Sequence, residues 1–486
     1  MDLRTEFRIG YDRHLETCGN AYTALYEAIR EAILQGQLTY GTRLPSSRQL
    51  ASSYGISRGT VNTAYEMLLS EGYIRAETGR GTFVDFQSAS AFGQKEHAAT
   101  IFLSPWVSQL DPVPDRGGSG RELRKPPADL TIGRVDPRLF PIEEWKTAYY
   151  AEVRSSAERP YESAFTTEGY VPLREAIALY LARERGVLAE PEQIVITNGS
   201  MHAIAILSML LIHEGDDVVV ENPSYGGIRR AVKAAGGRVL NAAVDREGII
   251  PDQWQSRLLF VTPTRQFPTG VALSLKRKTA LLKWAVSQDA VIIEDDYDSE
   301  FRWGERPTEP LKALDQTGRV VYIGTFSKTM LTDLRIGYAV LPSPLVDPFR
   351  RAKYLFEPYP TGIVEQRALS GFMASGRYGK HLRRMKRECG RRMIVFRNHI
   401  QPLLNRHFEF YDSDAGLHLY ARWRGASCDY DHFRQECEKA GIVWTDGNRY
   451  ELPNTEQRYA LFGFVHMNEQ ELMEAAAIIE SVIEHR

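Results

Sequence analysis

The segment between Gln87 and Asp129 restricts the possible folds of the chain most, because it separates two stretches that can each form a hydrophobic core. It contains Pro112, Pro114, Gly117-Gly118-Ser119-Gly120 and Lys125-Pro126-Pro127. Such a composition disfavours packing and is typical of a linker. We therefore predict a domain over residues 18–85, a linker over 86–129 and a second domain over 130–486, which suits a length of 486 residues.

Composition narrows the class of protein. A hydrophobic content of 43% and a net charge of −2 are ordinary for a globular protein and exclude a uniformly polybasic one. The charged start Met1–Glu6 and the short apolar run Ala203–Ile212 predict neither a signal peptide nor a membrane span. The four cysteines are scattered, so we expect no disulfide, no metal site and a reducing cytoplasm.

The first domain carries the pattern of a winged helix-turn-helix. Residues 21–36 place Tyr22, Leu25, Ile29 and Ile33 at helical spacing, and helices are expected to start near Ser46 and Ser57. Two short strands over 73–77 and 82–84 flank a glycine-rich tip at 78–81. In this arrangement the third helix enters the major groove of double-stranded DNA.

The candidate DNA-binding residues are short hydroxyl and amide side chains together with arginines. They are Arg43, Ser46, Arg48, Ser57, Arg58, Thr60, Asn62, Thr63 and Arg80. We expect Arg58 to read a base, and Arg43 and Arg48 to bind phosphates. The alternative is that the arginines are ordinary solvated charges.

The order of these motifs favours DNA binding. The stretches Arg43–Ala51, Gly55–Val61 and Gly79–Val84 closely resemble the GntR-type winged helix. The resemblance covers nearly all of residues 22–84 and implies an operator as the partner.

A lysine at the end of an apolar strand pattern is the centre of the second domain's chemistry. Val320–Thr325 leads to Ser327 and Lys328, and a partly desolvated lysine can form a Schiff base with an aldehyde. Thr325, Ser327 and Arg335 would bind a phosphate beside it.

Other motifs suit pyridoxal phosphate (PLP). Asp295 and Tyr297 follow another strand pattern and fit the roles of carboxylate for the pyridine nitrogen and donor for the 3′-oxygen. Gly199, Ser200 and Met201 begin an apolar helix, a usual phosphate site, and Tyr225 could stack on the ring. Taken singly, each motif is more often a solvated charge or a helix cap.

Together these motifs resemble the fold type I aminotransferases from about Leu130 to the C-terminus. Further matching stretches are Glu168–Ile177 and Gln266–Gly270. The resemblance implies an α/β fold with large and small subdomains and PLP as cofactor, with Phe267 beside it.

The whole chain resembles the MocR/GabR group of transcription regulators. That resemblance implies a homodimer with swapped DNA-binding domains. It also implies a small amine-bearing effector, sensed through an external aldimine.

Departures from the aminotransferase pattern argue against efficient catalysis. Phe267 replaces the usual asparagine, and Leu461 replaces the arginine that normally binds the substrate carboxylate. Arg265 stands where the regulators usually have histidine, and Asp333 adds a negative charge near the phosphate loop. We predict a PLP-dependent regulator with weak transaminase activity at most. The alternatives are an active aminotransferase with an accessory DNA-binding domain, and a regulator that has lost PLP.

Other basic or imidazole groups are candidates for the effector's charged group: His466, Arg229 and Arg230. His466 is a conditional partner, since an ordinary histidine is mostly neutral at pH 7.

Residues 377–397 form a separate basic stretch, with nine Lys and Arg and one Glu. We expect an amphipathic helix that links the subdomains, and contact with DNA is the alternative.

Overall fold

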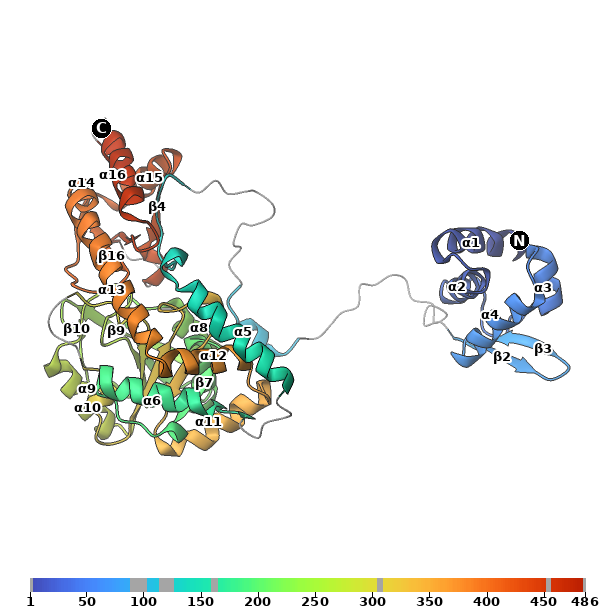
Figure 1. Ribbon diagram of the computed structural model, residues 1–486, viewed down its shortest axis with the longest axis horizontal. Helices are drawn as coiled ribbons and strands as arrows, with labels where there is room; N and C mark the ends of the chain where they lie inside the picture. The colour runs from blue at the N-terminus through green and yellow to red at the C-terminus, as the bar shows by residue number, and fades with distance from the viewer. Residues whose placement is uncertain are drawn as a thin grey trace. The chain divides into compact units, whose positions relative to one another are not determined.

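A computed structural model describes residues 3–87, 103–112, 126–158, 165–303, 309–451 and 456–483. The chain divides into two units, Met1–Leu103 and Ser104–Arg486, which Figure 1 shows as a small helical unit and a larger α/β unit. No helix in the described part is long and apolar enough to cross a bilayer.

The N-terminal unit is a helical domain with a three-stranded antiparallel sheet, in the order β1-β3-β2. Its elements are α1 (Leu3–Cys18), α2 (Ala21–Leu34), β1 (Arg43–Leu44), α3 (Ser47–Tyr54), α4 (Arg58–Ser70), β2 (Ile74–Glu77) and β3 (Gly81–Val84). The predicted helices and hairpin are present. Helix α1 lies before the expected start at residue 18, and its Tyr11 is buried against Tyr54, with ring centroids 5.4 Å apart.

Local hydrogen bonds fix the helix-turn-helix. The Ser46 hydroxyl accepts from the Gln49 amide at 3.3 Å, and the Gln49 side chain accepts from the Ser46 amide at 3.0 Å, which caps α3. Gly55 ends α3 with φ of 65°, a conformation that glycine adopts without strain. The Ser57 hydroxyl accepts from the Thr60 amide at 3.0 Å and caps α4.

The large subdomain of the second unit contains an eight-stranded sheet in the order β10-β9-β8-β11-β12-β13-β14-β7. Its strands are β7 (Ile194–Thr197), β8 (Asp217–Asn222), β9 (Arg238–Asp245), β10 (Gly248–Ile249), β11 (Leu258–Val261), β12 (Val291–Asp296), β13 (Val320–Thr325) and β14 (Gly337–Val340). Neighbours from β9 to β13 run parallel, whereas β14 is antiparallel to both β13 and β7.

Helices cover both faces of this sheet (Figure 1). They include α6 (Val171–Arg185), α7 (Ser200–Leu211), α8 (Gly226–Ala234), α9 (Leu275–Ser287), α10 (Leu311–Leu314), α11 (Ser343–Phe356) and α12 (Ile363–Ala374). Alternate residues of β13 pack on opposite faces: Val321 and Ile323 belong to the core that includes Leu207, whereas Tyr322 packs with Ile177. Two-sided burial explains the continuous apolar strands in the sequence.

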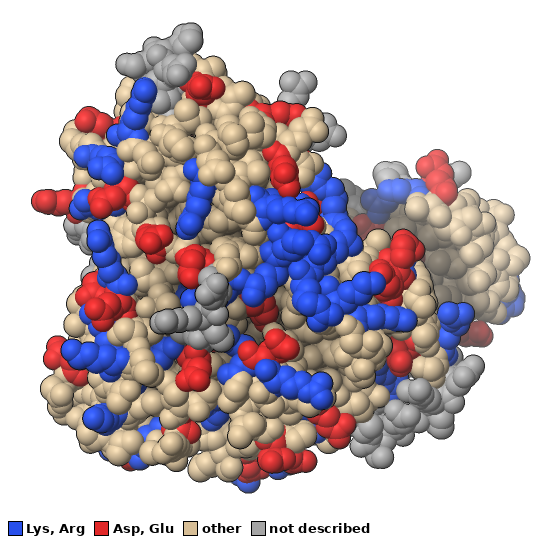
Figure 2. Space-filling model, turned by 60° about the vertical axis from the view of Figure 1, so that its left-hand side comes forward, with Lys and Arg blue, Asp and Glu red and all other residues tan. Residues whose placement is uncertain are grey.

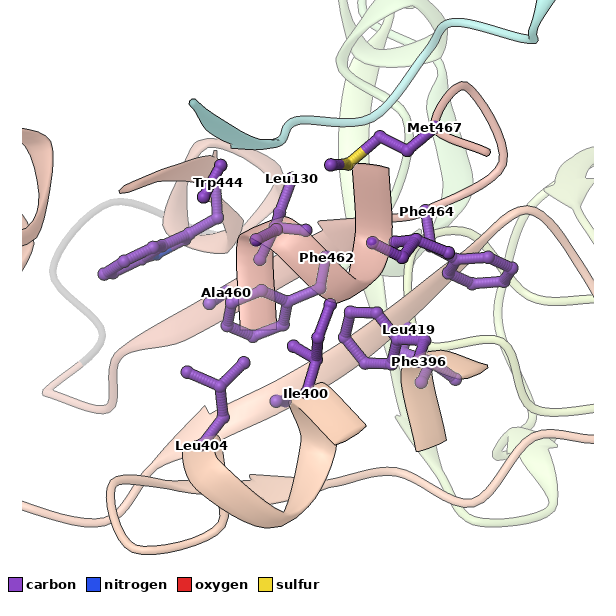
Figure 3. Packing of buried hydrophobic residues seen from close by; sticks show 14 of the residues in the cluster. Leu130, Phe396, Ile400, Leu404, Leu419, Trp444, Ala460, Phe462, Phe464 and Met467 are labelled. Atoms are coloured by element: carbon purple, nitrogen blue, oxygen red, sulfur yellow. The ribbon is translucent and has the colours of Figure 1, made fainter. Parts of the chain in front are cut away.

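The small subdomain is a second sheet in the order β15-β16-β18-β17-β4. It comprises β4 (Ala128–Leu130), β15 (Phe408–Phe410), β16 (His418–Trp423), β17 (Ile442–Asp446) and β18 (Tyr459–Gly463), with α13 (Arg377–Val395), α14 (Gln401–Leu404), α15 (Ser427–Lys439) and α16 (Glu469–Ile483). Figure 3 shows its core, where Phe462 of β18 lies among Phe396, Ile400 and Trp444. Helix α5 (Ile142–Glu158) packs on α12 of the large subdomain.

The expected linker, residues 86–129, contains ordered elements at its C-terminal side. A 3₁₀ helix, η2 (Pro105–Gln109), places Trp106 so that its indole N–H donates to the carbonyl oxygen of Ala234 at 2.8 Å. Asp111 lies 3.7 Å from Lys233, and β4 begins at Ala128. The second unit therefore starts earlier than the composition alone indicates.

Candidate functional site

The ends of neighbouring strands bring loops together in the large subdomain. Strands β12 and β13 are parallel, with Asp295 opposite Ile323. Thr325, the last residue of β13, lies opposite Gly337 of β14, which in turn lies opposite Thr197 of β7. The loops that follow Thr197 and Thr325 therefore meet, although they are far apart in sequence.

Gly199 and Arg335 form one side of this meeting point. Gly199 has φ of 81°, and a Cβ on it would lie 2.5 Å from an Arg335 guanidinium nitrogen. Arg335 donates to the Asn198 carbonyl at 3.3 Å and lies 3.5 Å from Ser327 Oγ. Because α7 begins at Ser200, the guanidinium adjoins a helix N-terminus, which is a favourable place for a phosphate.

Thr325 and Met201 belong to the two loops that meet here, and their side chains have different surroundings. The Thr325 hydroxyl donates to Ser327 Oγ at 3.1 Å and accepts from the Ser327 amide at 3.2 Å. Met201 packs its side chain toward Gly227 of α8, where its sulfur would be 2.5 Å from a Cβ. Met201 can therefore serve a phosphate through its backbone amide rather than its side chain.

Lys328 directly follows Ser327 in the sequence. Its Nζ donates to the Gly133 carbonyl oxygen at 3.2 Å. Burial lowers the pKa of the Lys328 amine; Asp298 opposes that shift and Arg335 adds to it. A lowered pKa leaves more of the neutral amine, the form that attacks a carbonyl.

Asp295 is a buried carboxylate, and its Oδ1 has no hydrogen-bond partner among the residues that the structure describes. Burial, reinforced by Asp296 and Asp298, raises the pKa of Asp295 to about 7. A buried polar atom without a partner costs free energy, and a positively charged N–H beside it would remove that cost. The protonated pyridine nitrogen of PLP is such a group.

Arg265 fixes the phenol of Tyr297. Its guanidinium is 3% exposed and donates to the Tyr297 hydroxyl at 2.8 Å and to Asp298 Oδ2 at 2.9 Å. A guanidinium only donates, so the Tyr297 oxygen must accept, and its own hydrogen is left for another acceptor. Burial raises the pKa of Tyr297, and Arg265 acts in the opposite direction.

The same arginine reaches the small subdomain. It donates to the carbonyl oxygens of His418 at 2.8 Å and Ala415 at 3.2 Å. A Cβ on Gly416 would lie 2.0 Å from the Arg265 guanidinium, so only glycine fits there. Arg265 therefore joins the two subdomains at the site.

Phe267 is the centre of an aromatic cluster. It makes edge contacts with Tyr225 at 5.9 Å, Tyr297 at 5.6 Å, His418 at 5.7 Å and Tyr450 at 4.9 Å between ring centroids. These rings come from both subdomains and provide an apolar wall for a planar ligand.

Sequence reasoning missed four residues that complete the site: Gly133, Asp298, His418 and Tyr450. Asp298 could have been suspected, because it directly extends the Asp295–Tyr297 motif. The other three reach the site from elements distant in the chain, and their local sequence carries no signal.

The effector candidates occupy different environments. Arg229 is held by Ser224 Oγ at 3.0 Å, the Glu221 carbonyl at 3.1 Å and the side chains of Asn222 and Asn241. Arg230 is exposed.

His466 is buried and lies 2.8 Å from the Asp129 carbonyl oxygen. It lines a cavity of about 440 Å³ together with Gly133, His381 and Met385. Leu461, by contrast, is fully buried opposite Tyr420 in the small sheet.

Four of the nine predicted DNA-binding residues line one groove of the N-terminal unit. Most are exposed, and a groove of about 1200 Å³ is lined by Arg43, Ser46, Arg48 and Asn62, among others. Arg58 Nε donates to Ser47 Oγ at 3.3 Å.

Other candidates at this face are already engaged. Ser46 and Ser57 serve as helix caps, and Thr60 Oγ1 lies 2.8 Å from Ser57 Oγ. Thr63 donates to the Gly59 carbonyl at 3.1 Å. On the wing, Arg80 is 77% exposed and pairs with Glu77 at 3.0 Å. Within the described part of the chain, no cluster of His, Cys, Asp or Glu could hold a metal ion.

Two family matches divide the chain at the same place as the fold. Residues 21–84 match the gntR family of bacterial regulatory proteins, and residues 129–479 match the class I and II aminotransferases.

Relatives match across both regions. The probable rhizopine catabolism regulatory protein MocR of Rhizobium meliloti is 34% identical over 94% of this chain and 92% of its own. The pyridoxine biosynthesis transcriptional regulator PdxR of Corynebacterium glutamicum is 31% identical over 82% of each chain.

Solved structures show the fold of the second unit. The α-aminoadipate aminotransferase LysN of Thermus thermophilus has a TM-score of 0.68 at 22% identity, over 79% of this chain and 97% of that one. The kynurenine aminotransferase of Pyrococcus horikoshii has a TM-score of 0.66 at 23% identity, over 73% and 90%.

The resemblances predicted from the sequence are thus confirmed for both units. The chain belongs to the MocR-type transcription regulators, in which a GntR-family winged helix is joined to an aminotransferase domain of class I and II.

Proposed function

We propose that this regulator holds PLP at Lys328 and changes its binding to operator DNA when an amine-bearing effector reaches that site. The observation that carries the proposal is Asp295, a buried carboxylate whose Oδ1 lacks a partner in a site that also contains a lysine of lowered pKa. Bound PLP would supply an aldehyde that condenses reversibly with amines.

The residues present fit PLP. Asp295 would accept from the ring nitrogen, and Tyr297, with its oxygen occupied by Arg265, would donate to the 3′-oxygen. Tyr225 and Phe267 would flank the ring. The phosphate would be held by the backbone of Gly199, Ser200 and Met201, the hydroxyls of Thr325 and Ser327, and Arg335.

Sensing, rather than turnover, agrees with the surroundings of Leu461. An efficient aminotransferase aligns its substrate by an arginine on the carboxylate, and such alignment can supply several kcal/mol of a barrier. Leu461 is apolar and fully buried. Arg229 is committed to neighbouring polar groups, so Arg230 and His466 remain as partners for an effector whose charged group lies farther from its amine.

A homodimer is supported by exposed apolar side chains close to the phosphate loop. Tyr354, Leu355, Phe356 and Tyr359 are 58–75% exposed, an unusual cluster for a free surface. Glu357, in the same segment, accepts from the Asn198 side-chain amide at 3.4 Å. A second copy covering this segment would adjoin the cofactor site. Swapping of the DNA-binding domains is the family expectation that accompanies the dimer.

The cofactor assignment predicts selective labelling of Lys328. After soaking with PLP the protein should be yellow, and borohydride should fix the cofactor to the Lys328 peptide. Lys278 is a matched control, because burial lowers the pKa of its amine to about 8 but it lies outside the site. Labelling of Lys278 instead, or a colourless protein, would refute the assignment. Lys328→Ala should retain DNA binding and lose the effector response.

Asp295→Asn should alter both the pH dependence of thermal stability and the affinity for PLP. The pKa of Asp295 is raised to about 7 in the folded protein, so the protonated carboxyl favours folding. That contribution is present below about pH 4 and is lost as pH rises through about 7. Without cofactor, the variant should therefore lose less thermal stability than the parent between about pH 5 and 8, and it should bind PLP more weakly.

Glu300→Gln is the control for this measurement. Burial also raises the pKa of Glu300 to about 7, but the group that donates a hydrogen bond to it is the Tyr180 hydroxyl, at 3.2 Å, which is not among the residues proposed to hold the ring. Glu300→Gln should reduce the pH dependence of thermal stability by a similar amount and leave the affinity for PLP unchanged. Equal loss of affinity in both variants would contradict the role of Asp295.

Arg58→Ala should relax specificity at one base position, with a cost of about 1–3 kcal/mol. Arg48→Ala should instead lower the binding affinity for all DNA sequences by the same factor, because a phosphate contact does not distinguish one base from another. Fluorescence anisotropy with duplexes selected from a random pool, and their single-base variants, measures both effects. An Arg58→Ala protein with unchanged base preference would exclude this residue as the specificity contact.

Spectral titration with amino acids, ω-amino acids and dipeptides should reveal an effector that changes the cofactor spectrum without sustained turnover. Aspartate and alanine should react slowly or not at all, because no arginine stands at position 461. Rapid, complete conversion to the pyridoxamine form by either one, with multiple turnovers, would support an aminotransferase instead.

A further inference from the structure

Helix α13 presents a row of basic side chains that the proposed function does not use. Its exposed basic residues are Arg377, Lys380, Arg383, Arg384, Lys386, Arg387 and Arg391. Figure 2 shows Lys and Arg gathered into a continuous patch on one face of the protein, with few acidic residues among them.

The fold fixes this row toward solvent. Tyr378, Met385, Cys389 and Met393, on the other side of α13, are buried in the cores of the two subdomains. Three of the six steps between successive basic residues are three or four positions and the others are one or two, so the residues form a broad stripe on the side of the helix that faces solvent. The stripe is about 21 Å long, at 1.5 Å per residue from Arg377 to Arg391.

Most of these charges have no acidic partner. Arg387 and Arg391 share Glu388, at 3.6 and 3.3 Å. For the other five, no ion pair occurs among the described residues. By contrast, Arg392 on the buried side is paired with Asp136 at 2.7 Å. Like charges one turn apart repel, so binding of a polyanion would stabilise the row.

We propose that α13 binds backbone phosphates of the same DNA duplex that the N-terminal unit recognises. This rests on the proposed DNA-binding function. A stripe of about 21 Å spans about six base pairs along the duplex axis, and guanidinium groups bind phosphate bidentately. Every exposed residue of the stripe from Arg377 to Arg391 is basic, whereas a helix that binds a lipid surface would place apolar side chains beside its charges.

Covalent linkage makes weak contacts effective. DNA bound by the winged helix is kept at high local concentration near the rest of the same chain, so contacts that are weak alone add to the total affinity. Such contacts read no sequence. They should lengthen the footprint on DNA and steepen the dependence of affinity on salt.

The test compares two fourfold variants of the full chain with equal change in charge. The first is Arg377→Gln, Lys380→Gln, Arg384→Gln and Arg387→Gln. The control is Arg238→Gln, Arg257→Gln, Lys276→Gln and Lys283→Gln, which are exposed residues elsewhere in the C-terminal unit. Affinity is measured over a salt series on duplexes of about 60 and about 20 base pairs that contain the same selected sequence.

The α13 variant should bind the long duplex about 10- to 100-fold more weakly at low salt. Its slope of log affinity against log salt should fall by about 0.9 for each phosphate that the helix no longer neutralises. The short duplex should be bound almost equally by all three proteins, and base preference should persist. Equal behaviour of the α13 and control variants on the long duplex would overturn the proposal.

Additional measurements separate other roles of the row. If Arg58→Ala loses sequence preference while its slope of log affinity against log salt is unchanged, the result concerns the proposed function alone. If the parent protein selects no DNA sequence, the proposed function is refuted. In that case the salt series on a mixed-sequence duplex still tests α13. Dissociation of the α13 variant in sedimentation would make the row a subunit contact. Binding to phosphatidylserine vesicles, abolished only in the α13 variant while its DNA binding is intact, would make it a membrane surface. Either result overturns the proposal.

Discussion

The ion pair between Arg265 and Asp298 is the interaction on which the candidate site depends. Both side chains are almost completely buried, 3% and 1% exposed, so each charge needs the other for compensation. The guanidinium also binds Tyr297 in the large subdomain and two carbonyl groups in the small one. One side chain therefore sets the direction of a phenol hydrogen and the closure of one subdomain on the other.

Negative charge elsewhere at the sheet edge is distributed unevenly. Asp296 pairs with Arg185 at 2.7 Å and accepts from the Tyr322 hydroxyl at 2.6 Å, and Asp298 pairs through its Oδ2 with Arg265 at 2.9 Å. Asp295 precedes both in the sequence, and no ion pair of Asp295 occurs among the described residues. The two neighbouring acids are thus each compensated by an arginine of the protein, whereas Asp295 is not, which agrees with the proposal that it faces a cationic ligand.

Much of the architecture could be predicted from the sequence, because local patterns determine it. Caps at Ser46 and Ser57, helical periodicity and the glycine-rich wing tip are all short-range signals. The positions of Lys328 after β13 and of Asp295 at the end of β12 were predictable as well, since both strands are apolar and are parallel neighbours. Their roles toward a cofactor stay predictions. Contacts of long range were not predictable: His418 and Tyr450 lie in the small subdomain and contact Phe267 of the large one. The hydroxyls of Ser46 and Ser57, expected at DNA, are engaged mainly in capping.

Helix α8 has a contact at each end that bears on signalling. Its first turn follows Tyr225, whose ring touches Phe267 beside the cofactor residues, and its last turn receives the indole of Trp106. Trp106 belongs to the stretch of chain that continues toward the winged helix. Helix α8 is nine residues long, so one short element connects the ring contact of Tyr225 with the contact of Trp106. A ligand that moved the Tyr225 ring would therefore act on the same helix that anchors Trp106.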